Sequence, residues 1–213
     1  MNRLPLAPEG WIFIIPVMIM TALALLVQWY LAAILLGGLA ALLIGFFRDP
    51  RRRGSAREID VLSPADGTVV QILEVPEDSV WPGLTTQVSI LMSVFDVHVN
   101  RAPITGKIVH YHYAPGKNLA AADKSSSENE QNLVVIDDGR TRVGVRQIAG
   151  VLARRIVFDR KEGDKVARGE RIGMIRFGSR VDLFLPREAE ILVSLREKVK
   201  VGLTVMAHLQ EKA

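Results

Sequence analysis

The first quarter of the chain contains a long apolar stretch, residues 10–47, in which no side chain is charged. One helix of this length would measure about 57 Å, nearly twice the ~30 Å hydrocarbon core of a bilayer. The middle of the stretch, residues 28–30, reads Gln-Trp-Tyr, and such polar and aromatic side chains favour the membrane interface. We therefore predict two apolar helices, at about 11–27 and 31–47, that either span the bilayer or dip into one leaflet.

A basic segment with the sequence FFRDPRRRGSAR directly follows the apolar stretch. Its arginines are Arg48, Arg51, Arg52, Arg53 and Arg57. Arginine clusters next to apolar helices lie on the cytoplasmic side and face anionic headgroups, so we expect the protein at the cytoplasmic face of the cell membrane. A signal peptide does not fit, because the apolar stretch is too long and Arg3 is the only basic residue before it.

Beyond residue 57 the pattern changes to short runs rich in valine and isoleucine, interrupted by glycine, proline or aspartate. Such runs are typical of β-strands joined by turns. We predict a membrane-associated segment, residues 1–57, and a β-rich domain, residues 58–213, without any helix of three turns. The expected strands are 59–63, 68–75, 87–94, 97–101, 104–113, 132–138, 141–149, 151–158, 170–177, 180–185 and 190–195.

A turn followed by a strand recurs in the β-rich domain. The sequences DKVARGERIGMI, from Asp164, and EKVKVGLTVMAH, from Glu197, share an acid-Lys-Val start, then a glycine and an aliphatic residue. PADGTVVQI, from Pro64, is a similar unit. These units resemble the hairpins of lipoyl and biotinyl carrier domains. We therefore predict a mainly β fold, a lipoyl-like sandwich of short hairpins with an N-terminal hydrophobic helical hairpin.

The composition narrows the classes of function. The chain has 27 Lys and Arg against 23 Asp and Glu, a formal net charge of +4. This mild basicity suits an anionic membrane surface and gives no sign of nucleic-acid binding. The absence of cysteine excludes disulfides, thiol catalysis and cysteine-ligated metals.

Ser179 stands out because it follows Gly178 inside the strand-like run GMIRFGSRVDLFLP. Glycine weakens strand pairing and a buried hydroxyl needs a partner, so this pair requires a reason. A nucleophilic serine needs an adjacent base and an orienting acid. His98, in FDVHVNRAPITG, projects to the face opposite its two valine neighbours, and Asp66, in SPADGTV, reads by itself as a turn residue. The remaining histidines are expected to be structural or solvated: His110, His112 and His208.

Five motifs in a fixed order carry a resemblance to a known family: FFRDP, SPADG, FDVHVNR, SENE and RFGSRVD. Together they resemble a phosphatidylserine decarboxylase proenzyme of the short bacterial and archaeal type. The resemblance extends over essentially the whole chain from Phe46 onward.

The resemblance implies that the chain cuts itself between Gly178 and Ser179. In that family the serine hydroxyl attacks the preceding carbonyl, β-elimination releases the upstream chain, and the serine remnant becomes a pyruvoyl group. The products would be a β chain, 1–178, and an α chain, 179–213, held as a heterodimer or a larger assembly. Elementary chemistry agrees, because glycine has no Cβ to obstruct the attack and serine supplies the nucleophile. The cofactor would be this pyruvoyl group, with no metal and no pyridoxal phosphate.

The resemblance also implies that His98 activates Ser179 and that Asp66 orients His98. The substrate would be phosphatidylserine in an anionic membrane, converted to phosphatidylethanolamine and CO2, with the pyruvoyl group as the electron sink. The long type of the family has a second histidine where this chain has Arg101. Either His98 serves both cleavage and protonation, or another group takes one of these roles.

The polar segment 114–132 has two interpretations. Its lysines, serines and amide could hold the phosphate or carboxylate of the headgroup, or the segment is a solvated loop. The side chains concerned are Lys117, Lys124, Ser125, Ser126, Ser127 and Asn129.

Two other classes of protein fit parts of the sequence. A membrane-anchored, lipoyl-like binding or adaptor module without catalysis would use the apolar hairpin and the repeated turn, but the chain has no Met-Lys pair and no heptad run. A serine hydrolase would need a Gly-x-Ser-x-Gly elbow, and FGSRV is not one. The decarboxylase is therefore the leading hypothesis.

Overall fold

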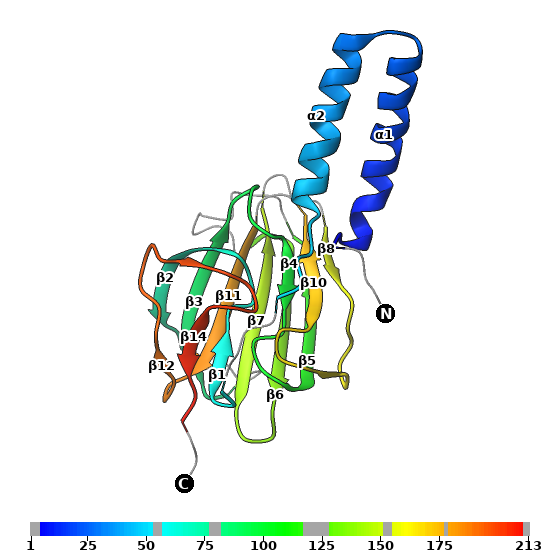
Figure 1. Ribbon diagram of the computed structural model, residues 1–213. Helices are drawn as coiled ribbons and strands as arrows, with labels where there is room; N and C mark the ends of the chain where they lie inside the picture. Colours follow the sequence, from blue (N-terminus) through cyan, green and yellow to red (C-terminus); the bar gives the residue numbers. More distant parts are fainter. Residues whose placement is uncertain are drawn as a thin grey trace. The chain divides into compact units, whose positions relative to one another are not determined.

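The computed structural model describes residues 5–52, 57–76, 82–116, 128–150, 155–176 and 179–210. The chain divides into two units, Met1–Arg51 and Arg52–Ala213. The first unit is helical and the second is mainly β (Figure 1). The domain boundary expected after residue 57 stays a prediction.

An apolar helical hairpin forms the first unit. The short 3-10 helix η1 (Pro8–Gly10) leads into α1 (Trp11–Leu26), and α2 (Tyr30–Phe46) packs beside α1 (Figure 1). The stretch Pro8–Leu26 is long and apolar enough to cross a membrane, whereas α2 is apolar but shorter. The two predicted helices are confirmed to within one residue at each end.

The outer surface of this hairpin is apolar. Ile12, Leu26 and Leu31 are 72, 78 and 74% exposed. Soluble monomers rarely expose contiguous apolar surface on this scale, and such surface marks contact with a partner or a membrane. The hairpin therefore has the surface that lipid would cover.

The second unit consists, among its described residues, of short strands without an α-helix. They are β1 (Asp60–Leu62), β2 (Gly67–Glu74), β3 (Leu84–Met92), β4 (Val99–Arg101), β5 (Gly106–Ala114), β6 (Gln131–Asp137), β7 (Arg142–Ala149), β8 (Ile156–Phe158), β9 (Lys165–Val166), β10 (Arg171–Ile175), β11 (Ser179–Pro186), β12 (Glu190–Ile191), β13 (Lys198–Val199) and β14 (Val205–His208).

These strands form antiparallel sheets. The largest is curled and has the strand order β13-β2-β3-β11-β7-β6-β5-β9 (Figure 1). Two smaller sheets have the orders β4-β10-β8 and β1-β14-β12. The mainly β class with an N-terminal helical hairpin is confirmed.

The strand predictions agree with most of the observed strands, with three omissions. The predicted set lacks β9, β13 and β14, of which the first two have only two residues each and so show no alternation. The strand expected at 151–158 is seen as β8, and residues 151–154 lie outside the described residues.

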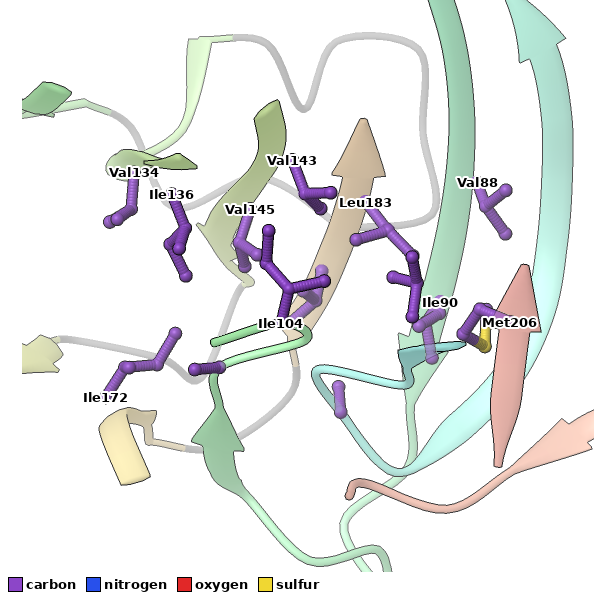
Figure 2. Close-up of a cluster of buried hydrophobic side chains, with 14 of the residues drawn as sticks. Val88, Ile90, Ile104, Val134, Ile136, Val143, Val145, Ile172, Leu183 and Met206 are labelled. Carbon is purple, nitrogen blue, oxygen red and sulfur yellow. The ribbon is translucent and has the colours of Figure 1, made fainter. Parts of the chain in front are cut away.

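The hydrophobic core sets the register of β11. Val181, Leu183 and Leu185 are fully buried in it, and Figure 2 shows Leu183 between Val145 of β7 and Ile90 of β3. Burial of one such side chain contributes about 1.5–3 kcal/mol. Because side chains alternate between the two faces of a strand, the odd-numbered residues of β11 face this core and the even-numbered ones face away from it.

Candidate active site

Ser179 is the first residue of β11 and is 1% exposed. It is paired with Met92 of β3 and with Ala149 of β7, so the strand is held on both sides from its first residue. Its Oγ donates a hydrogen bond to Sδ of Met92 at 3.1 Å. A thioether is a weak acceptor, so little is lost when this hydroxyl turns to a stronger one. Gly178, the other residue of the predicted cleavage site, lies outside the described residues.

Backbone pairing brings His98 close to the same place. His98 directly precedes β4 and is fully buried. Its carbonyl oxygen accepts a hydrogen bond from the amide of Ile175 at 3.2 Å, and Ile175 ends β10. Only three residues separate Ile175 from Ser179. His98 therefore lies beside the segment that leads into the predicted cleavage site.

A backbone contact selects one tautomer of the neutral His98 ring. Its Nδ1 lies 2.9 Å from the carbonyl oxygen of Asp96. A carbonyl oxygen only accepts hydrogen bonds, so Nδ1 must carry the hydrogen. The neutral ring then has its lone pair on Nε2, which is the arrangement that a general base requires.

Asp66, in the turn before β2, is 6% exposed and holds several chain segments together. Its Oδ1 accepts a hydrogen bond from the amide of Val201 at 2.7 Å, and its Oδ2 accepts one from the amide of Val97 at 3.3 Å. Both oxygens also bind the guanidinium of Arg52, with an Nη2–Oδ2 distance of 2.9 Å. Asp66 is thus hydrogen-bonded to the amide of Val97, the residue directly before His98.

Arg52 is a site residue that the sequence interpretation missed, because it was grouped with the membrane-facing arginines. Its side chain is only 13% exposed, whereas the neighbouring Arg51 is exposed. Besides Asp66, its Nη1 binds the carbonyl oxygen of Val201 at 3.2 Å. Arg52 and Asp66 are 14 positions apart in the sequence, so no local sequence pattern predicts that they form a pair.

A chain of buried amides was also missed. Gln147 of β7 donates to Oδ1 of Asn100 in β4 at 2.8 Å, and Asn132 of β6 donates to Oε1 of Gln147 at 2.9 Å. All three side chains are at most 1% exposed. The chain ties the strand that follows His98 to the strand that pairs with Ser179. Asn100 lies two positions after His98 and therefore on the same face of the chain. This spacing was the signal in the sequence that could have indicated a polar partner near His98.

The segment 114–132 is described only at its two ends. Asn129 is 1% exposed and donates from Nδ2 to the carbonyl oxygen of Ala149 at 2.8 Å, so it supports the strand beside Ser179. The other headgroup candidates, Lys117, Lys124 and residues 125–127, lie outside the described residues.

Arg101, which the resemblance sets against a second histidine of the long type, makes backbone contacts. Its Nη1 donates to the carbonyl oxygen of Gly169 at 2.9 Å, and its amide donates to that of Pro64 at 3.1 Å. The residue therefore joins the turn before β10 to the turn that carries Asp66.

The face of β11 that points away from the core carries a buried charge cluster. Asp182 has no exposed surface and is bound by Arg180, with an Nε–Oδ1 distance of 2.6 Å, and by Arg146, with an Nη2–Oδ2 distance of 2.7 Å. Arg146 also lies 4.9 Å from the ring centre of Phe184. Ser179 and this cluster are on opposite faces of one strand, so the cluster supports the strand from behind.

The surroundings of Ser179 fit a pyruvoyl group made from this residue. The side chain is nearly inaccessible to solvent, which suits a carbonyl that must not be lost to side reactions. The ladders from β3 and β7 begin at Ser179 itself, so they would hold a new chain terminus at this position.

Comparison with known proteins identifies the family. The sequence model of the family described as Phosphatidylserine decarboxylase matches residues 39–207. A phosphatidylserine decarboxylase proenzyme of Symbiobacterium thermophilum is 45% identical over 213 residues, 99% of each chain. That of Magnetococcus marinus is 44% identical over 209 residues, 97% of this chain and 96% of the relative. That of Syntrophus aciditrophicus is 48% identical over 160 residues, 74% and 75% of the two chains. The chain therefore belongs to the phosphatidylserine decarboxylase family.

Proposed function

We propose that this chain decarboxylates phosphatidylserine to phosphatidylethanolamine after it has cut itself between Gly178 and Ser179. The reaction class, a carboxy-lyase with a pyruvoyl cofactor derived from serine, follows from family membership. The assignment of residues is supported by one observation above all. The amide of Ile175, four positions before Ser179, donates to the carbonyl oxygen of His98, and the carbonyl oxygen of Asp96 lies within hydrogen-bond distance of Nδ1 of the same His98.

The self-cleavage uses groups of this chain and one water molecule. The hydroxyl of Ser179 gives its proton to Nε2 of His98, and its Oγ adds to the carbonyl carbon of Gly178. The C–N bond between the two residues breaks, and the nitrogen takes up the proton, which leaves an ester. Loss of the Cα proton of Ser179 then breaks the Cβ–Oγ bond. Residues 1–178 leave with a carboxylate at Gly178. A water molecule then displaces the α-nitrogen of residue 179, which departs as ammonia, and the oxygen of the water becomes the carbonyl oxygen of the new pyruvoyl group.

Residue 179 would hold the pyruvoyl group in the mature enzyme, and this group would supply the electron sink that decarboxylation requires. The chain positions the reacting groups around it. Met92 and Ala149 hold the strand terminus, and the carbonyl of Asp96 keeps the His98 ring oriented. We assign to His98 both the cleavage and the later protonation, because Arg101 binds a backbone carbonyl instead of carrying an imidazole.

The remaining assignments extend this proposal. We place the protein at the cytoplasmic face of the membrane, since the arginines that follow the apolar hairpin favour that side. We infer that residues 1–57 form the membrane-associated part, that the chains 1–178 and 179–213 stay together, and that the β-rich part is a lipoyl-like sandwich. The interleaving of β11 between β3 and β7 supports continued association, because the cut would leave both ladders in place.

Intact mass spectrometry of the purified protein tests the proposal. We expect two chains, residues 1–178 and 179–213, with a carbonyl group in place of the amine at the start of the shorter one. Ser179→Ala should give one chain and no decarboxylation. Ser89→Ala is the matched control, because Ser89 is also fully buried, on β3, but faces away from the core. An uncut protein that still decarboxylates the lipid would contradict the mechanism.

A further inference from the structure

The turn between β3 and His98 exposes two apolar side chains next to the reaction site. Phe95 is 76% exposed and Val94 is 41% exposed. Among the large apolar side chains described in residues 52–213, Phe95 is the most exposed. A single exposed apolar residue is ordinary, but an adjacent pair at the tip of a turn beside an active site calls for an explanation.

This turn is held in a defined shape. The amide of Ser93 donates to Oδ2 of Asp96 at 2.8 Å, and the amide of Asp96 donates to the carbonyl oxygen of Ser93 at 2.9 Å. The two bonds close the turn below Val94 and Phe95. Exposure of the two side chains is therefore a property of an ordered turn, and contact of their exposed apolar surface with water is unfavourable.

The turn is also joined to the groups that would react. Met92, which directly precedes it, accepts the hydrogen bond from Oγ of Ser179 at 3.1 Å. Asp96, which ends it, accepts the hydrogen bond from Nδ1 of His98 at 2.9 Å. Whatever Val94 and Phe95 contact is thus held within a few residues of both the nucleophile and the base.

We propose that Val94 and Phe95 form a bilayer-docking turn, which enters the interfacial region of a membrane that contains phosphatidylserine. This inference rests on the proposed function, since it assumes that Ser179 marks the reacting position. The reactive part of the lipid is its headgroup, while the acyl chains stay in the bilayer, so the site has to be brought to the interface. An aromatic ring is suited to that depth.

The size of the patch favours a bilayer over a protein partner. Stable protein interfaces bury about 800 Å² on each side, which two adjacent side chains do not provide. The only charged side chain of the turn, Asp96, has Oδ2 bound to the amide of Ser93, so it does not stand at the tip as an isolated charge.

A comparison of two substrates tests the docking turn. The full-length Val94→Ser, Phe95→Ser double variant is assayed on phosphatidylserine in vesicles and on short-chain phosphatidylserine dispersed in detergent. We expect the rate on vesicles to fall at least about tenfold more than the rate on the dispersed lipid, because only the former requires docking. Leu73→Ser is the control, because Leu73 is also an exposed apolar residue, 47% exposed, but lies away from the turn. It is near the end of β2 and pairs with Gln87 of β3, whereas the turn follows Met92.

Each outcome of this assay has one meaning. Equal losses on the two substrates, or no loss on vesicles, would overturn the docking turn. A wild-type protein that is inactive even on the dispersed lipid would instead overturn the proposed function. Intact mass measured on the same samples shows whether the variant still cuts itself, so failure to fold or to mature is recognised separately.

The absence of cysteine allows a direct measurement of insertion. Phe95→Cys provides a single site for an environment-sensitive dye, and Arg140→Cys provides the control in the exposed turn between β6 and β7. Vesicles with phosphatidylserine should shift the emission of the dye at position 95 to shorter wavelength and leave position 140 unchanged. Equal behaviour at the two positions, or a shift that depends on protein concentration without lipid, would overturn the proposal; the second result would indicate contact between copies.

Discussion

The two ends of the eight-stranded sheet differ in the burial of their polar side chains. Near Ser179 the polar side chains are buried and bound to one another. Asn132 binds Gln147 within this sheet, and Gln147 binds Asn100 of the sheet β4-β10-β8. At the other end, in the turn between β6 and β7, Asp138 is exposed and accepts hydrogen bonds from the amides of Arg140 and Thr141. Both ends belong to the same antiparallel ladders.

The difference separates groups that close a turn from groups that serve a site. A carboxylate in water closes a turn at little cost, whereas a buried polar group is unfavourable unless every partner is in place. The fold retains His98, Asp66 and Asp182 in its interior with their partners around them. Such burial indicates that these residues are kept for positioning or chemistry and that their removal has large effects.

The largest effect is expected for His98→Ala. Loss of a general base slows proton transfer about 10²- to 10⁴-fold, so the variant should accumulate as an uncut chain. The time course of cleavage, followed by intact mass, measures this. His112→Ala, at an exposed position on β5, should cut normally. Normal processing of His98→Ala would remove His98 as the activating base.

The next effect is on stability, at Asp182. Asp182→Ala leaves the buried Arg180 and the neighbouring Arg146 without their carboxylate, and the loss of one partner of a buried ion pair costs about 3–5 kcal/mol. Denaturant unfolding of the full chain should be measured in the Ser179→Ala background, where one chain remains. Asp138→Ala at the opposite end should cost about 1 kcal/mol or less. Equal losses for the two variants would show that burial at the Ser179 end has no special weight.

A smaller effect on cleavage is expected for Arg52→Ala. The variant removes charge-assisted hydrogen bonds worth about 1.5–3 kcal/mol, and if Asp66 loses its position we expect roughly tenfold to hundredfold slower self-cleavage. Arg52→Lys should restore part of the rate, and Arg51→Ala should cut like the wild type. Because Arg52 acts through Asp66, its removal should add little to Asp66→Asn. Additive losses would contradict that route.

The smallest effect belongs to the exposed end of the sheet, at Asp137. Burial by itself raises the pKa of this carboxyl, but hydrogen bonds from the Arg142 side chain and from the amide of Gly139 outweigh it and hold the pKa below its ordinary value. The folded-state pKa is thus depressed, so the pair stabilises the fold above the unfolded-state pKa and the contribution is lost as the pH falls through the folded-state pKa. Arg142→Ala should cost at most about 1 kcal/mol at pH 7. The unfolding midpoints of the wild type and Arg142→Ala should therefore converge in strong acid. A difference between them as large as at pH 7 would contradict this origin of the stabilisation.

The sequence alone determined the parts of this protein that depend on neighbours in the chain. The charge-free stretch determined the apolar hairpin, because apolar length and an uncharged composition are local properties. The alternating runs determined most strands, and the order of the motifs determined the family. The two-residue strands β9 and β13 escaped prediction, since they are held by pairing partners and carry no pattern of their own. The equally short β12 was predicted because it lies within the largely apolar run 190–195.

Only the tertiary structure decided which polar groups meet. Arg52 reaches Asp66 across 14 positions, Gln147 reaches Asn100 across 47, and Arg146 reaches Asp182 across 36. The sequence shows each of these residues, but strand register decides whether two of them face each other, and a shift of one residue would turn every side chain to the opposite face. The environment of Ser179 is therefore a product of the sheet, because the core residues of β11 set the register that brings Met92 and Ala149 to its sides.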